Sequence, residues 1–160
     1  MAEPTGRQRL EWLAAAFGVE PGFEDIWGRR HEVPDAGLRA LLDQLGVPAD
    51  SDADIDRGLA RAHVRYWRSL AEPVVVLTLP AATLAVTLRL PSRGSGARVA
   101  WRLVPETGEP SQGDAEVDAM ALRERSEVEG VAHESRTLAI DAALAPGYHR
   151  LELRTDDTEA

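Results

Sequence analysis

The stretch Leu84-Ala85-Val86-Thr87-Leu88-Arg89-Leu90 decides the fold of the second half of this chain. Leucine or valine occupies every second position, and smaller or polar residues stand between them. This period of two is typical of a β-strand with one buried face. The alternation recurs at Val99, Trp101 and Leu103, which predicts another strand with the tryptophan on its inner face. From residue 71 onwards the chain is therefore expected to be a β-structure.

Other segments of the second half complete a predicted set of five or six short strands. One uninterrupted apolar run, Val74 to Leu79, lies between two prolines and is expected to form a strand. The turn cluster Pro91 to Gly96 is expected to close a hairpin. Further strands are predicted around Leu138 and Ile140 and over Tyr148 to Arg154, while Val117 and Val131 mark short edge strands.

These strands favour a two-sheet, immunoglobulin-like antiparallel sandwich, in which a core tryptophan packs between the sheets. The corner at Pro146-Gly147-Tyr148 fits this plan. In a regular strand, however, Tyr148 would lie on the same face as polar Arg150, whereas His149 would lie on the same face as Leu151. Either a bulge shifts the register or His149 takes the inward place. Because the chain ends in a polar segment, Thr155 to Ala160, soon after this strand, we expect a truncated sandwich with one unpartnered sheet edge.

The first half is predicted to be helical. Apolar residues recur at spacings of three and four in three stripes, and each stripe marks one face of a helix. Thr5 and Gln8 have the spacing of a capping box, and Gly18 can close the first helix. Gly58 weakens the third helix by about 1 kcal/mol relative to alanine, so tertiary packing must hold it. The stripes are Leu10, Leu13, Ala14 and Phe17; Leu38, Leu41, Leu42 and Leu45; and Ile55, Leu59, Ala62 and Tyr66.

The predicted fold class is therefore α+β, with a helical subdomain over residues 1–70 and a β-sandwich domain over residues 71–160. The formal net charge of −9 argues against nucleic acid and anionic membranes as partners. The absence of cysteine excludes disulfides and zinc–thiolate sites. No apolar run approaches the roughly 20 residues that span a bilayer. We expect a soluble, cytoplasmic protein.

Sequence motifs give no support for an active site, a metal site or a cofactor within this chain. His31-Glu32 begins like a zinc-protease motif, but Pro34-Asp35 interrupts it before a second histidine. The alternating acids of Asp50 to Asp56 suggest a calcium loop, but Ile55 and Arg61 replace the required glycine and glutamate. No pair of carboxylates lies on a recognisable strand end beside a sugar cleft, as a glycosidase requires.

One local cluster, Trp27, Arg29, Arg30 and His31, is the candidate interface or glucan contact. It lies on the linker between the first two helices. A tryptophan face can stack on a sugar ring, and arginine can donate hydrogen bonds to hydroxyls. Tryptophan and arginine are also enriched at protein interfaces, so a neighbouring domain is a second candidate. Because aromatic residues usually bury their bodies in small domains, we expect Trp27 to pack under the helices.

Four strings, in matching order and separation, carry a family resemblance. They are Asp25 to His31; Leu38 to Pro48; Tyr66-Trp67 shortly before Val74 to Leu77; and Pro146 to Leu153. Together they resemble the N-terminal region of bacterial 4-α-glucanotransferases (amylomaltases) of glycoside hydrolase family 77. The set covers almost the whole chain.

The resemblance implies a parent enzyme that transfers α-1,4-glucan segments between maltooligosaccharides. It places the catalytic (β/α)8 barrel of that parent after Ala160, so none of its catalytic residues falls in this sequence. The expected role here is scaffolding or positioning of the maltooligosaccharide substrate, without catalysis. An independent carbohydrate-binding module and a protein-interaction sandwich are the alternatives. A carbohydrate-binding module would need a row of exposed aromatics, and only 5% of the residues are aromatic.

Overall fold

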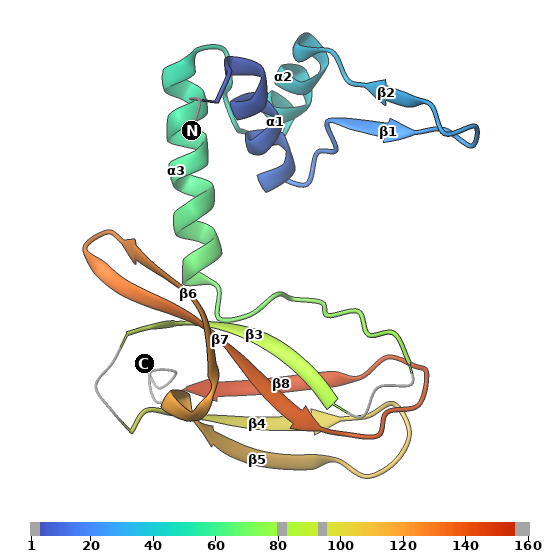
Figure 1. Ribbon diagram of the computed structural model, residues 1–160, viewed down its shortest axis with the longest axis vertical. Coiled ribbons are helices and arrows are strands. Elements are labelled where there is room, and N and C mark those ends of the chain that lie inside the picture. Colours follow the sequence, from blue (N-terminus) through green and yellow to red (C-terminus); the bar gives the residue numbers. More distant parts are fainter. Residues whose placement is uncertain (1–3, 80–82, 93–95, 156–160) are drawn as a thin grey trace. The chain divides into compact units, whose positions relative to one another are not determined.

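The computed structural model describes residues 4–79, 83–92 and 96–155 and divides into two compact units. The first unit, Met1–Tyr66, contains helices and a short hairpin, and the second, Trp67–Ala160, contains two β-sheets (Figure 1). The predicted combination of a helical segment and an antiparallel β-sandwich is confirmed.

The described residues form three α-helices: α1 (Gly6–Ala16), α2 (Asp35–Gln44) and α3 (Asp52–Arg68). The predicted capping box opens α1, because Gln8 N donates to Thr5 Oγ1 at 3.3 Å and Thr5 N donates to Gln8 Oε1 at 2.9 Å. Ser51 caps α3 in the same way, accepting from the backbone of Asp54 at 3.2 Å. The apolar faces enclose one core, made by Leu10, Leu13, Ala14, Leu38, Leu42, Val47, Ala49 and Ile55.

The predicted stripes are correct in position but too wide. Leu38 and Leu42 are buried, whereas Leu41 and Leu45, on the flank of the same stripe, are 48% and 54% exposed. Tyr66 is also exposed, although Ile55 at the other end of its stripe is buried. A helix of a small unit buries only the narrow face that meets its neighbours, so residues on the flank of the stripe remain in contact with solvent.

The linker between α1 and α2 folds into a hairpin that the sequence did not predict. Its strands, β1 (Gly22–Glu24) and β2 (Arg30–Glu32), pair antiparallel with Phe23 opposite His31. Gly22 is required there, because a Cβ at that position would lie 2.6 Å from the carbonyl oxygen of His31. The hairpin carries the candidate cluster at its tip.

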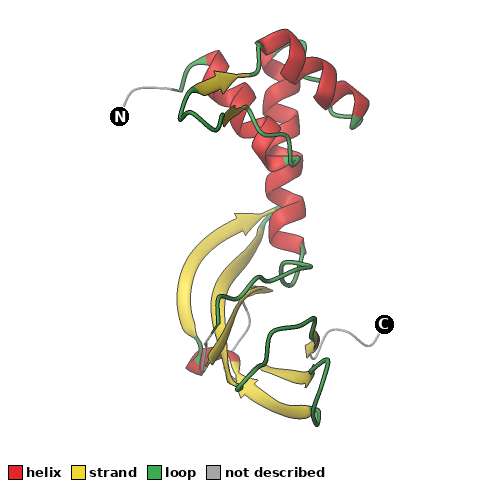
Figure 2. Ribbon diagram, turned by 90° about the vertical axis from the view of Figure 1, so that its right-hand side faces the viewer, coloured by secondary structure: helices red, strands yellow, loops and turns green. Residues whose placement is uncertain are grey.

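The described residues of the sandwich form two three-stranded antiparallel sheets. One has the order β3-β7-β6, with β3 (Thr83–Pro91), β6 (Ala121–Val128) and β7 (Val131–Asp141). The other has the order β5-β4-β8, with β4 (Arg98–Val104), β5 (Ser111–Glu116) and β8 (Arg150–Thr155). Figure 2 shows these strands in yellow and the 3-10 helix η1 (Val117–Ala119), which connects β5 to β6, in red.

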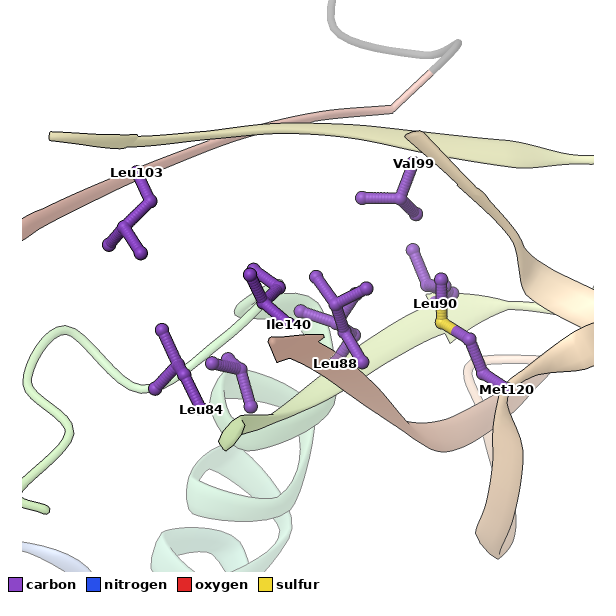
Figure 3. Close-up of a cluster of buried hydrophobic side chains, with 9 residues drawn as sticks. Leu84, Leu88, Leu90, Val99, Leu103, Met120 and Ile140 are labelled. Atoms are coloured by element: carbon purple, nitrogen blue, oxygen red, sulfur yellow. The ribbon is translucent and has the colours of Figure 1, made fainter. Parts of the chain in front are cut away.

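The predicted alternation places the core between the sheets. Leu84, Leu88 and Ile140 point from β3 and β7 towards Val99 and Leu103, which point back from β4 (Figure 3). Trp101 shares the inward parity of Val99 and Leu103 and packs against the same cluster, as predicted. The alternation Leu84 to Leu90 thus sets the buried face of β3.

Three strand predictions in the second half are wrong. Val74 to Thr78 lie in no strand, because an apolar run without alternation does not specify one buried face. Val117 lies in η1, and Val131 begins the long strand β7. The strands β5 and β6 were missed because their sequences are polar. Both are edge strands, which need only one hydrogen-bonded neighbour and tolerate polar side chains.

Two turn predictions also need correction. The prediction of a hairpin at Pro91 to Gly96 is wrong, because β3 and β4 do not pair with each other. They belong to different sheets. Arg93 to Ser95 of that turn lie outside the described residues, as do residues 156–160 of the expected truncated edge. Tyr148 is 93% exposed and forms no inward corner, and β8 begins two residues later than predicted.

Candidate functional site

The β1–β2 hairpin carries the four predicted residues, all of them exposed, and they are called the hairpin tip below. Trp27 and Arg29 lie in its turn, and Arg30 and His31 lie in β2. The turn closes when Gly28 N donates to the Asp25 carbonyl and Asp25 N donates to the Arg29 carbonyl, each at 2.9 Å. Gly28 has φ +76°, a left-handed conformation that glycine adopts without strain. The tip therefore has a defined backbone.

The Asp25 carboxylate organises this turn. Its Oδ1 accepts hydrogen bonds from the backbone of Trp27 and of Arg29, both at 2.9 Å, and its Oδ2 lies 2.9 Å from His31 Nε2. The hydrogen bond from His31, followed by those from the backbone, lowers the pKa of Asp25 below its ordinary value. The carboxylate therefore stays ionised and holds the turn closed. Sequence analysis did not assign Asp25 a role, although aspartate at a tight turn commonly bonds nearby backbone amides.

The aromatic residues of the hairpin are exposed, which overturns the expectation that Trp27 packs under the helices. Trp27 is 77% exposed, and its neighbour Ile26 is 90% exposed. Phe23 stacks on the His31 ring with centroids 5.0 Å apart and planes 17° from parallel. Hydrogen bonds from the backbone amides of residues 27 and 29 to Asp25 fix the turn that carries the exposed Trp27. The tip thus presents an exposed indole, whereas the guanidinium of Arg30 lies back along the hairpin, with Nη2 3.4 Å from the position of a Cβ on Gly22.

A second feature, an open pocket of about 670 Å³, lies in the sandwich unit and was missed by sequence analysis. Core leucines from both sheets form one side, and residues 71–79 and 144–149 form the rest. The valines of the predicted strand that did not form, Val74 to Val76, lie at this pocket. An apolar run between prolines was the only sequence signal for it.

The polar side chains that line the pocket are Glu72, Tyr148 and His149. Glu72 accepts a 2.9 Å hydrogen bond from Arg89. His149 Nδ1 accepts from the backbone of Glu106 at 3.1 Å, so its Nε2 carries the proton and donates to the Ala145 carbonyl at 3.0 Å. Both ring nitrogens of His149 are thus occupied. The side chain is half-buried and lines the pocket with Leu151 and Leu153, which fits the second sequence alternative, in which His149 takes the inward place.

In the described part of the chain, no group of three or more histidine, aspartate or glutamate side chains is arranged to hold a metal ion. None of the helices in residues 4–79, 83–92 and 96–155 is long and apolar enough to cross a membrane.

Comparisons with known proteins point in one direction. Residues 70–160 match the family model described as the MalQ N-terminal beta sandwich domain. A 4-alpha-glucanotransferase of Mycobacterium tuberculosis is 29% identical over 148 residues, which are 92% of this chain and 20% of that protein. The relative from Mycobacterium bovis matches equally well. The crystal structure of amylomaltase from Corynebacterium glutamicum superimposes with a TM-score of 0.66 at 28% identity, covering 94% of this chain and 21% of that one. The chain therefore spans about a fifth of the length of these relatives.

Proposed function

Since the chain belongs to the family of MalQ N-terminal β-sandwich domains, we propose that it is the non-catalytic N-terminal region of a 4-α-glucanotransferase. Such an enzyme transfers α-1,4-glucan segments between maltooligosaccharides, and we place it in the cytoplasm. The two compact units would serve as its helical subdomain, near residues 1–70, and its sandwich domain, near residues 71–160. The observation that carries the proposal is the alignment of 92% of this chain with only 20% of a glucanotransferase.

In this proposal, the catalytic residues lie in the other four-fifths of the enzyme, within a (β/α)8 barrel. Glycoside chemistry uses two carboxyl groups, one of which is held protonated by a raised pKa until it donates to the leaving oxygen. Among the described residues, hydrogen bonds lower the pKa of Asp25, Asp54 and Glu134, so these carboxylates cannot serve as that acid near neutral pH. Their partners are His31, Ser51 and Arg136, respectively.

The test of this proposal compares two polypeptides for disproportionation of maltotriose, with released glucose as the readout. The 160-residue chain alone should release no glucose. The complete gene product that contains this sequence should release it continuously. Turnover by the purified 160-residue chain, or an inactive complete product under the same conditions, would contradict the proposal.

The role of the hairpin tip is a separate part of the proposal. Trp27, Arg29, Arg30 and His31 would contact either the glucan or the neighbouring catalytic part. The exposed indole supports this, because a tryptophan that only stabilised the helical core would be buried.

Calorimetric titration of maltoheptaose into the 160-residue chain distinguishes a glucan contact from a contact with the catalytic part. A glucan contact predicts heat of binding that is lost in Trp27→Ala. The matched control is Trp12→Ala, since Trp12 on α1 is also 55% exposed but lies outside the hairpin. Heat that both variants retain would exclude the tip as the glucan site. An absence of heat in the parent chain would leave the contact with the catalytic part.

A further inference from the structure

One exposed apolar surface of the sandwich is the valine segment, defined as Pro73–Leu79. Val74 is 74% exposed and Val76 is 87% exposed, although both side chains are apolar. Tyr148, which lines the same pocket, is 93% exposed. Contiguous exposed apolar surface of this kind marks an interaction site more often than an isolated exposed side chain does.

The valine segment rims a preformed opening into the core. Leu84 and Leu103, which line the pocket of about 670 Å³, are at most 6% exposed and belong to opposite sheets. Leu77, at the middle of the segment, packs against the same core cluster and anchors the segment. The pocket therefore offers apolar walls from both sheets to an incoming apolar side chain.

The chemistry of the pocket favours a protein occupant over a sugar. A glucan must exchange its hydroxyl–water hydrogen bonds for bonds to protein groups, or binding is lost. Within the lining, Glu72 is already bonded to Arg89, and both nitrogens of His149 are bonded to backbone. Tyr148 and the 56% exposed carboxylate of Glu72 are the polar side chains left to meet a ligand, and the remaining walls are aliphatic, glycine or proline.

The segment is also unsuited to remaining in water. From Pro73 to Leu79 it contains no charged residue, and three consecutive valines give it strong β-propensity. Exposed uncharged runs of this composition promote self-association of chains. A permanent cover within one polypeptide avoids that, because a tethered partner is present at a high effective concentration.

We propose that the valine segment, together with Tyr148 and the pocket beneath it, is the docking surface for the catalytic part of the same enzyme. This inference rests on the proposed function, which supplies the occupant: the relatives carry about four-fifths of their length outside the matched region. Apolar side chains of that part would enter the pocket, and the valines would pack around them. The hairpin tip need not take part in this contact.

Amide hydrogen exchange tests the docking surface in the complete enzyme. Residues 74–79 should exchange at least about tenfold more slowly there than in the 160-residue chain, because docking excludes water from their backbone. Val76→Asp should abolish this protection in the complete enzyme. In the 160-residue chain it should leave the unfolding temperature unchanged, since the side chain is already 87% exposed.

The matched control is Val131→Asp, at the start of β7, where the valine is 49% exposed and does not line the pocket. This variant should retain the protection of residues 74–79. Equal exchange in the two parent polypeptides would overturn the proposal. Protection that appears only when maltoheptaose is added would also overturn it, because the occupant would then be a glucan. Protection of the 160-residue chain that increases with its own concentration would overturn it as well, because the occupant would then be a second copy.

Glucose release by the same preparations keeps the two proposals distinguishable. An inactive complete enzyme whose residues 74–79 are protected would contradict the proposed function while supporting the docking surface. An active enzyme whose residues 74–79 exchange freely would contradict only the docking surface.

Discussion

The indole of Trp101 on β4 lies over Gly113, the residue directly opposite it on β5. A Cβ at position 113 would stand 2.8 Å from Cζ2 and 3.1 Å from Cε2 of that indole. Those atoms belong to a rigid ring packed against the sandwich core, so they cannot move aside as the end of a flexible side chain would. Gly113 is therefore the residue that lets the predicted core tryptophan lie between the sheets.

Substitution at this position tests that relationship. Gly113→Ala should destabilise the sandwich by about 1–3 kcal/mol, the usual cost of overpacking a core. The measurement is the free energy of unfolding in urea, followed by tryptophan fluorescence. Gly6→Ala is the control, because a Cβ there would meet nothing within 4 Å. If both variants were equally stable, the close packing of Trp101 on β5 would be wrong.

Arg89 provides a second test, because its charge is buried on the outer face of β3. Its Nε donates to the Ser69 carbonyl at 2.8 Å, its Nη1 donates to the Glu72 carboxylate at 2.9 Å, and the residue is only 4% exposed. Arg89→Ala should cost about 2–4 kcal/mol, since it removes hydrogen bonds from a charged donor together with the packing of an almost fully buried side chain. Glu72→Gln should cost no more than about 1 kcal/mol, because the carboxylate is 56% exposed.

Urea unfolding of the two variants gives the comparison. A larger loss for Glu72→Gln than for Arg89→Ala would show that the ion pair, and not the hydrogen bonds to the backbone, holds this arginine.

Replacing Gly58, in the middle of α3, by alanine would have two opposed effects on stability. Alanine would improve helix propensity by about 1 kcal/mol. A Cβ there would, however, lie 2.7 Å from Cδ1 of Leu13, which is fully buried. Overpacking typically costs about 1–3 kcal/mol, so Gly58→Ala should be destabilising by roughly 1 kcal/mol. Thermal unfolding followed by circular dichroism measures it, and a stabilised variant would mean that Leu13 repacks without cost.

The hairpin tip should depend on pH through Asp25. Its pKa is lowered in the folded state, chiefly by the hydrogen bond from His31, so the carboxylate stabilises the tip above the unfolded pKa of about 3.9. That stabilisation should disappear as the pH falls through the lowered folded value. The amide resonances of Trp27 and Arg29, which both donate to Asp25, should report this transition in an NMR titration.

Asp25→Asn is the matched variant for this titration, because it removes the ionisable group while keeping the size of the side chain. The two amides should then show no transition in the same range. A transition that persisted in Asp25→Asn would have to come from another group.

Local patterns in the sequence were sufficient for much of the fold. The alternation from Leu84 to Leu90 placed β3 and its buried face, and the capping box of Thr5 and Gln8 placed the start of α1. Both signals are local, since they act between residues at most four positions apart along one element. The family resemblance, drawn from four separate strings, was confirmed by the match to the β-sandwich family.

The sites followed from contacts that no local pattern encodes. Arg89 stands at a solvent-facing position of the alternation, yet residues 69–72 cover it and bury its charge. The turn that carries Trp27 is held by the hydrogen bonds of Asp25, and the pocket depends on leucines from two sheets. For the three helices and for β3 and β4, the sequence by itself determined which face is apolar, because that depends on periodicity alone. Tertiary structure decided which of those faces is covered, because burial requires a partner from a distant part of the chain.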